Sequence, residues 1–173
     1  DTVSGVISGT PSVISGSSTY TVTATNSGGS TSFGVIITVN DSAPSSLSYT
    51  SPNVFTKDVA IASLSPSVSG GAVVSYSIAP ALPLGLSFDT ASGVISGTPT
   101  SIVGTGNYTV TATNSGGSTS FDVVITVNDN APSSLSYTSP NVFTKNVAIT
   151  PLSPSVSGGL VVSYSIAPAL PLG

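Results

Sequence analysis

Apolar and polar residues alternate with a period of two along the clearest stretches of the chain. In "YTVTATN" (Tyr108 to Asn114) the apolar side chains fall on one face and the threonines on the other. In "STSFDVVITV" the apolar face carries Phe121, Val123, Ile125 and Val127. This period is typical of a strand with one buried face, and the "SGG" between the two stretches is a turn signal. The pattern therefore predicts a β-hairpin.

Shorter stretches of the same kind precede this hairpin, and none has the 3.6-residue spacing of a helix. They predict a strand at Ser45–Thr50 with Leu47 and Tyr49 inward. A second strand is expected within "NVFTKDVAIASLSPSV", broken by the polar turn "TKD", with residues 59–64 as its later part. The remaining strands are expected at "VVSYSI" with Val74, Tyr76 and Ile78 inward, at "LSF" with Leu86 and Phe88 inward, and at "GVISG". Seven strands separated by frequent turn signals indicate an all-β sandwich without helices.

The chain repeats itself with a period of 88 residues. When it is shifted by 88 positions, 85 pairs align and 71 of them are identical (173 − 88 = 85; 85 − 14 mismatches = 71). The differences gather in Ser12–Thr19 and its counterpart Thr100–Asn107, which we expect to be a loop because loops tolerate change. Residues 42–129 then form one complete unit. Residues 1–41 are expected to hold the last three strands of a preceding unit, and residues 130–173 the first three strands of a following unit.

Composition excludes several classes of function. The chain has no Cys, His or Glu, so neither a zinc centre nor a catalytic triad can be built, and we expect no enzyme. A net charge of −4 with only Lys57 and Lys145 as bases gives no surface for nucleic acid. No apolar run approaches the ~18 residues that suggest a membrane span.

Two longer phrases carry a resemblance to a known family. "LPLGLSFDTASGVISGTP" followed by "YTVTATNSGGSTSFDVVITV" resembles the Ig-like domain repeat family of bacterial surface proteins, whose members are similar to cadherin-like sandwiches. The resemblance implies tandem Ig-like domains, secreted or at the cell surface, that act as a structural stalk or as a filament unit. Two alternatives stay open. One is an adhesin that binds a host or glycan ligand through its loops, and the other is a non-catalytic spacer of a large secreted enzyme.

The phrase "VNDNAP" is similar to the linker that holds calcium between cadherin repeats, and it makes Asn128, Asp129 and Asn130 weak calcium candidates. Calcium takes six to eight oxygen ligands, usually with several carboxylates. Thr126 and Asn114 stand where the cadherin phrases have acidic residues, so a hydrogen-bonded turn at the end of the strand is favoured. We expect the junctions to be nearly independent of metal.

Some Ig-like surface domains contain an isopeptide bond between a lysine and an asparagine beside a buried acid. Here Lys57 and Asn128 could lie on neighbouring strands, with Asp89 as the nearest acid. The polar phrase "TKD" instead favours a solvated lysine in an exposed turn.

A half-sandwich exposes an apolar face and unpaired strand edges, which need partners. Residues 1–41 and 130–173 are therefore expected to be covered either by neighbouring repeats of a longer array or by copies of the same chain. In the second case the two halves complete each other between molecules.

Overall fold

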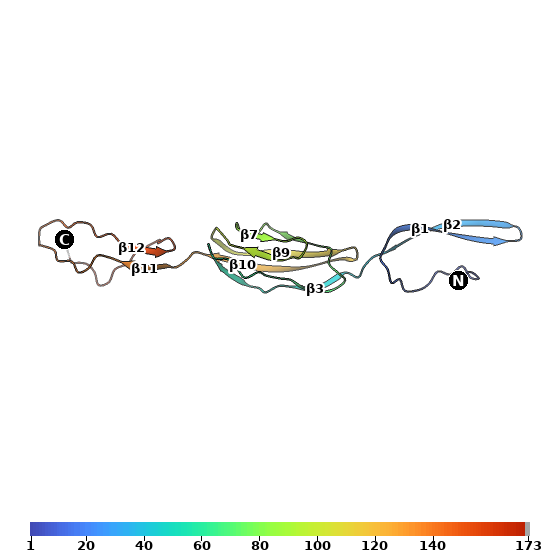
Figure 1. Ribbon diagram of the computed structural model, residues 1–173, viewed down its shortest axis with the longest axis horizontal. Coiled ribbons are helices and arrows are strands. Elements are labelled where there is room, and N and C mark those ends of the chain that lie inside the picture. Colours follow the sequence, from blue (N-terminus) through green and yellow to red (C-terminus); the bar gives the residue numbers. More distant parts are fainter. Residues whose placement is uncertain (172–173) are drawn as a thin grey trace.

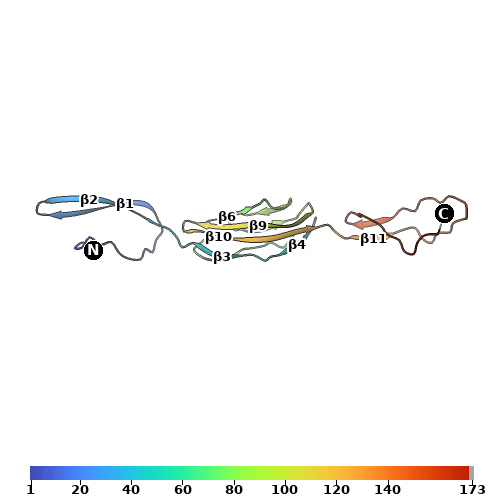
Figure 2. The same cartoon turned by 180° about the vertical axis from the view of Figure 1, so that it is seen from behind.

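The computed structural model describes residues 1–171, which contain twelve strands and no helix. Figures 1 and 2 show three parts in a row, with the first hairpin and the last strand pair at opposite ends of a central body. The first part holds β1 (Ser15–Asn26) and β2 (Gly29–Val39), and the last holds β11 (Pro132–Ser136) and β12 (Ser155–Gly158). The central body, called the central sandwich below, consists of β3 (Pro44–Ser48), β4 (Asn53–Thr56), β5 (Ser67–Gly70), β6 (Ser75–Ala79), β7 (Leu86–Phe88), β8 (Ile95–Gly97), β9 (Val103–Asn114) and β10 (Gly117–Asn128).

One four-stranded sheet, in the order β4-β10-β9-β6, is the larger layer of the central sandwich. The hairpin β9–β10 occupies its middle, and strands from the first half of the unit flank it on both edges. β6 pairs antiparallel with β9, whereas β4 runs parallel to β10. The other strands form the short pairs β3–β5 and β7–β8, and an isolated bridge joins Leu64, which is in no strand, to Ile95 of β8.

The core lies between these layers and has the composition that the alternation predicts. β9 buries Tyr108, Val110 and Ala112, and β10 buries Val123, Ile125 and Val127, so the inward faces of the hairpin are confirmed apart from Phe121. Leu47 and Tyr49 are buried opposite them, as expected, with Ile95 from β8. Leu86 and Phe88 are partly buried and pack against this core. The all-β fold is therefore the one that the sequence predicts.

Two expectations about the strands before the hairpin are wrong. Residues 59–64 form no strand and contribute only the bridge at Leu64, whereas the neighbouring strand β5 lies at Ser67–Gly70. Val74 is exposed because β6 begins only at Ser75, and Val73 packs against the core in its place. The part of the strand expected within "NVFTKDVAIASLSPSV" that precedes "TKD" is present as β4.

Two expectations about the hairpin also need correction. Phe121 is expected to be a buried core residue, but it is only partly buried and packs against the core from outside. The centroid of its ring lies 6.2 Å from that of Tyr49. The variable stretch Thr100–Asn107 is not wholly a loop, because β9 begins at Val103. There the chain pairs with the end of β10, with Gly106 opposite Ile125.

Tyr49 provides a test of the core. Its hydroxyl donates a buried hydrogen bond of 2.7 Å to the carbonyl oxygen of Gly93. Tyr49→Phe leaves that oxygen without a partner, so we expect unfolding in urea to show a loss of about 1–2 kcal/mol. Tyr137, one repeat later, is 47% exposed, and Tyr137→Phe is the matched control with no expected loss. Equal effects of the two substitutions would contradict this assignment.

The same tyrosine makes the stability of the central sandwich fall at alkaline pH. Burial, and secondarily Tyr76, raises the pKa of Tyr49 well above its ordinary value. The folded state therefore holds this proton more tightly than the unfolded chain does. Stability from this group is present below pH ~10, where unfolded tyrosine ionises, and falls as the pH rises further. We expect the loss of stability above pH ~10 to be smaller in Tyr49→Phe, which denaturation at a series of pH values would measure.

The two outer parts lack strands in a systematic way. The counterpart of β8, residues 7–9, forms no strand, and neither do residues 141–144 and 163–167, the counterparts of β4 and β6. In the central sandwich β4 pairs with β10 and β6 with β9, and both pairs join the first half of the unit to the second. β8 pairs with β7, whose residues Leu86–Phe88 have no counterpart among the 173 residues. The expectation of three strands in each outer part is therefore wrong. Only the pairs internal to one half form, namely β1–β2 and β11–β12.

Candidate interaction surfaces

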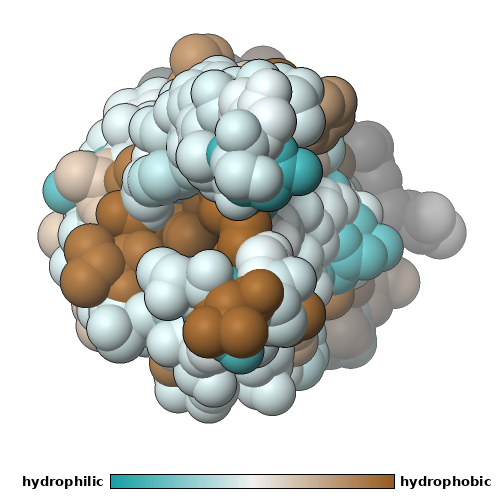
Figure 3. All heavy atoms as spheres, turned by 90° about the vertical axis from the view of Figure 1, so that its right-hand side faces the viewer, coloured by the Kyte–Doolittle hydropathy of each residue, from teal (hydrophilic) through white to brown (hydrophobic). Residues whose placement is uncertain are grey.

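The hairpin β1–β2 presents an apolar face that its counterpart in the central sandwich buries. The phrase "YTVTATN" occurs in both hairpins. Tyr20 and Val22 are 50% and 37% exposed, whereas Tyr108 and Val110 are 6% and 0% exposed. Phe33 on β2 is exposed as well. Figure 3 shows apolar side chains gathered in a hollow at this end of the molecule. The same residues are thus core in one place and surface in the other.

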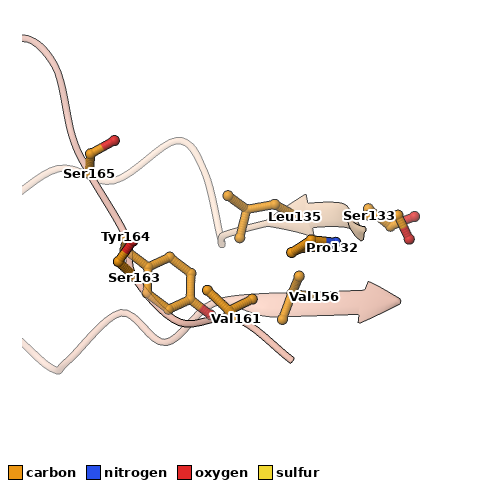
Figure 4. Close-up of a pocket in the computed structure, with 9 residues that line it drawn as sticks. Pro132, Ser133, Leu135, Val156, Val161, Ser163, Tyr164 and Ser165 are labelled. Carbon is orange, nitrogen blue, oxygen red and sulfur yellow. The ribbon is translucent and has the colours of Figure 1, made fainter. Parts of the chain in front are cut away.

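The C-terminal part has a complementary hollow. A cavity of about 430 Å³ opens beside β11 and β12, with apolar lining from Leu135, Val156, Val161 and Tyr164 (Figure 4). One repeat earlier, the corresponding side chains are Leu47, Val68, Val73 and Tyr76, which belong to or pack against the central core. In that core the residues facing them include those of β9 and β10. The cavity therefore has the lining that the β9–β10 hairpin covers in the complete sandwich.

The junction before β3 is fixed by the turn between β9 and β10. The backbone N–H of Asp41 donates to Ser115 Oγ at 3.1 Å. The side-chain amide of Asn114 donates to the carbonyl oxygens of Ser42, at 2.7 Å, and Ala72, at 3.1 Å. Asn114 is buried, and its own oxygen accepts from the backbone of the turn at Gly116. These contacts hold the connector against the end of the central sandwich.

The sequence analysis names Asn114 only as an asparagine that stands where cadherin phrases have an acid, and it does not predict the contacts of this side chain with the connector. The phrase "NSGG" indicates an Asx turn, and the turn is present. The hydrogen bond from the Asn114 amide to the carbonyl oxygen of Ser42 joins residues 72 positions apart. No local sequence pattern predicts a contact over that separation.

Gly116 offers a test of this junction. A Cβ atom there would lie 2.0 Å from the carbonyl oxygen of Asp41, while one at Gly28, the counterpart, would meet only Asn26 Oδ1 at 3.2 Å. Gly116→Ala must therefore displace the connector, and we expect a loss of about 1–3 kcal/mol, the usual cost of overpacking. Gly28→Ala should change stability by much less. Thermal unfolding of both variants measures the difference, and equal shifts would contradict a packed junction.

The weak calcium candidates lie at the other junction. Asp129 accepts a hydrogen bond from the backbone of Asn130, and the Asn130 amide donates to the carbonyl oxygen of Lys57 at 3.1 Å. The backbone carbonyl of Asn128 accepts from the N–H of Lys57. Within residues 1–171 no group of three or more acidic, histidine or cysteine side chains is placed to hold a metal. That the junctions are nearly independent of metal stays a prediction.

The arrangement required for an isopeptide bond is only partly present. Lys57 and Asn128 are neighbours through their backbones, but the Lys57 ammonium pairs with Asp58 at 3.3 Å in a part-exposed position. Asp89 is exposed, and its carboxylate accepts hydrogen bonds from the N–H groups of Ala91 and Ser92, which lower its pKa. No acidic side chain is buried in the described part of the chain. Asp89 therefore stabilises a turn.

The two layers, the buried faces and the connectors together define an Ig-like β-sandwich. A family model described as "Putative Ig domain" matches residues 35–128, more than half of the sequence, and the chain belongs to this family. The resemblance seen in the sequence is thereby confirmed. Families of Ig-like domains are generally non-catalytic. Comparison with curated protein sequences gave no match.

Several solved structures are similar to this chain at low identity. A chimeric titin Z1Z2 tandem is 21% identical with a TM-score of 0.36, and the match covers 65% of each chain. A titin I-band fragment, I67–I69, is 19% identical with a TM-score of 0.43 over 67% of this chain and 43% of the other. Protocadherin Gamma B7 cadherin domains 1–4 are 15% identical with a TM-score of 0.35 over 76% and 44%. The chain thus spans less than two thirds of each of these proteins. Among residues 1–171 no helix is long and apolar enough to cross a membrane.

Proposed function

We propose that this chain is a structural segment of a bacterial cell-surface or extracellular filament protein, in which residues 42–129 are one load-bearing unit of a stalk. Its partners are further units of the same kind, in the same chain or in copies of it. The proposal is supported by membership of the Ig-like family and by the row of parts in Figure 1. A composition without His, Cys or Glu is consistent with a structural and non-catalytic role.

The observation that carries the proposal is the parallel pairing of β4 with β10. Residues Asn53 to Thr56 lie beside Ile125 to Asn128 in the same direction. The chain reaches β4 at its N-terminal end and leaves β10 at its C-terminal end. The N-terminal connector leads to β4 through β3, so tension that has passed the β3–β5 pair pulls β4 and β10 in opposite directions along their length. Such a load falls on all the hydrogen bonds of the pair together, which resists extension better than opening the bonds one at a time.

Single-molecule stretching of residues 1–173 between flanking handles tests this role. We expect one abrupt unfolding event. The release of 88 residues at ~3.5 Å each, less a folded length of ~40 Å, is a gain of roughly 270 Å. Gradual extension without such an event would overturn the proposal.

The lateral contacts of Asn53 allow a matched comparison. Asn53 is buried, and its amide donates to the carbonyl oxygens of Thr50 and Val124 beside the β4–β10 pair. We expect Asn53→Ala to lower the unfolding force. Asn141, its counterpart, bonds only locally to Thr138, and Asn141→Ala should leave the force unchanged.

A further inference from the structure

We propose that the connector between consecutive units is a rigid joint, because each unit grips the backbone of the connector that enters it and ties down the connector that leaves it. The two connectors here are residues 40–43, between β2 and β3, and residues 129–131, between β10 and β11 (Figures 1 and 2). The proposal rests on the proposed function, since a stalk keeps its far end away from a surface only when its units hold their direction. It names the residues that give such a stalk its stiffness.

Two Gly-Gly turns of the central sandwich form a slot for the entering connector. One is the phrase "SGGA" at the end of β5, and the other is "SGGS" between β9 and β10. Three successive carbonyl oxygens of the connector occupy space that a glycine Cβ atom would need, namely Asp41 at Gly116, Ser42 at Gly71 and Ala43 at Gly70. A side chain at any of these glycines would collide with the connector. The glycines therefore let the connector's backbone lie directly against both turns.

Hydrogen bonds close the slot around the same backbone. The N–H of Gly71 donates to the carbonyl oxygen of Ala43 at 3.2 Å. The buried side-chain amide of Asn114 donates to the carbonyl oxygen of Ser42 in the connector and to that of Ala72 in the first turn. Asn114 stands at the start of the second turn, so it joins the connector to both turns. A connector held by its carbonyl groups in this way cannot swing without leaving these polar groups unpaired, which costs free energy.

The second connector meets a turn of the same kind. A Cβ atom on Gly159 would collide with the carbonyl oxygen of Asn130, and one on Gly158 with that of Ala131. The N–H of Gly159 donates to the carbonyl oxygen of Ala131 at 3.3 Å. Residue 130 is an asparagine where its counterpart, Ser42, is a serine. The turn therefore holds connectors of different sequence in one way, because it contacts their backbone.

The end of the central sandwich ties down the leaving connector. The N–H of Lys57 donates to the carbonyl oxygen of Asn128 at 2.9 Å, which continues the β4–β10 pairing by one residue. The side-chain amide of Asn130 then donates to the carbonyl oxygen of Lys57 at 3.1 Å. Asn130 thus contacts the central sandwich through its side chain and the turn of the next part through its carbonyl oxygen.

A residue that contacts both sides leaves no free length of linker between them. Flexible linkers are solvated runs of several residues, usually rich in Gly and Ser. Each connector here ends instead at a proline, Pro44 or Pro132. A proline ring fixes its own φ angle and restricts the residue before it. Bending at the joint therefore requires that one of the two grips opens.

Backbone amide relaxation, measured by NMR on residues 1–173 in dilute solution, tests the joint. The slot on residues 41–43 and the tie on Asn130 both belong to the central sandwich, so the test does not depend on the outer parts. We expect the amides of residues 41–43 and 129–130 to have order parameters of about 0.85, as in rigid backbone, whereas flexible segments lie below about 0.6. Values below about 0.6 in either connector of the parent chain would overturn the proposal.

Two substitutions open the grips one at a time. Gly71→Ala sets a Cβ atom against the carbonyl oxygen of Ser42, so it should lower the order parameters of residues 41–43 below about 0.6 and leave residues 129–130 unchanged. Asn130→Ala removes the amide that bonds to Lys57, so it should loosen residues 129–130 alone. If Gly71→Ala also displaces the amide signals of β9 and β10, the Asn130→Ala variant decides. Connectors that stay ordered in Asn130→Ala, or that loosen together, would contradict the proposal.

Two further substitutions are matched controls. A Cβ atom on Gly104 would meet nothing within 4 Å, so Gly104→Ala should leave both connectors as in the parent chain. Ser42→Ala should do the same, because the slot holds the carbonyl oxygen of this residue. Order lost in the connectors of either control would overturn the proposal.

The stretching experiment on the central sandwich is a separate measurement. Mobile connectors together with one abrupt unfolding event would overturn the rigid joint and leave the proposed function standing. Ordered connectors together with gradual extension would overturn the proposed function and leave the joint standing.

Discussion

Val110→Asp should unfold the central sandwich at room temperature, whereas the same change at Val22 should leave it folded. Val110 is fully buried between the layers. An unpaired carboxylate at that position costs several kcal/mol or must take up a proton. A unit of 88 residues has a total stability of only about 4–13 kcal/mol, so this cost is a large part of it.

Circular dichroism and the dispersion of amide signals in NMR spectra measure the outcome. Val22 occupies the same place in the hairpin β1–β2 but is 37% exposed, so its aspartate stays in water. Val22→Asp therefore controls for the chemistry of the substitution in an identical local sequence. A folded Val110→Asp protein with unchanged stability would show that the inward face of β9 is assigned wrongly.

Ile95→Ala should lower the free energy of unfolding by about 2–5 kcal/mol, the usual range for a large aliphatic core residue. Ile95 is fully buried in β8, and its backbone exchanges two hydrogen bonds with Leu64, so it ties the segment before β5 to the β7–β8 pair. The sandwich cannot close around the lost volume without moving β8 and the segment at Leu64.

The repeat again provides the control. Ile7 stands in the same phrase, "SGVISGTP", but is 60% exposed and lies in no strand. Ile7→Ala should change stability by less than about 0.5 kcal/mol, as surface substitutions usually do. Urea titration of both variants, analysed for the central sandwich, gives the two values. Similar losses would mean that the N-terminal part is packed like the centre.

The sequence predicted most reliably the features that depend on local alternation. The faces of β9 and β10 were foreseen because Tyr108, Val110 and Val123 alternate with polar residues in long strands. The strand at 67–70 was missed because "SVSG" carries a single apolar residue and no pattern to detect. Val74 was misplaced because alternation does not show where a strand begins.

The interaction surfaces were foreseen in kind but not in detail. The repeat showed that the outer parts are halves, and hence that they expose apolar faces. It did not show that the missing strands are those whose partners lie outside the same outer part, since pairing order is a property of topology and not of local sequence. The junction contact of Asn114 was invisible for the same reason, because it joins segments 72 positions apart.

Amide hydrogen exchange in a dilute, monomeric solution of residues 1–173 tests the central claim most directly. The claim is that one sequence phrase is core in the central sandwich and open surface in the N-terminal part. The amides of Tyr108 to Ala112 should exchange at least about a hundredfold more slowly than those of Tyr20 to Ala24, because a lone hairpin is marginally stable and a packed strand opens only with the whole unit. Equal exchange in the two phrases would contradict the claim.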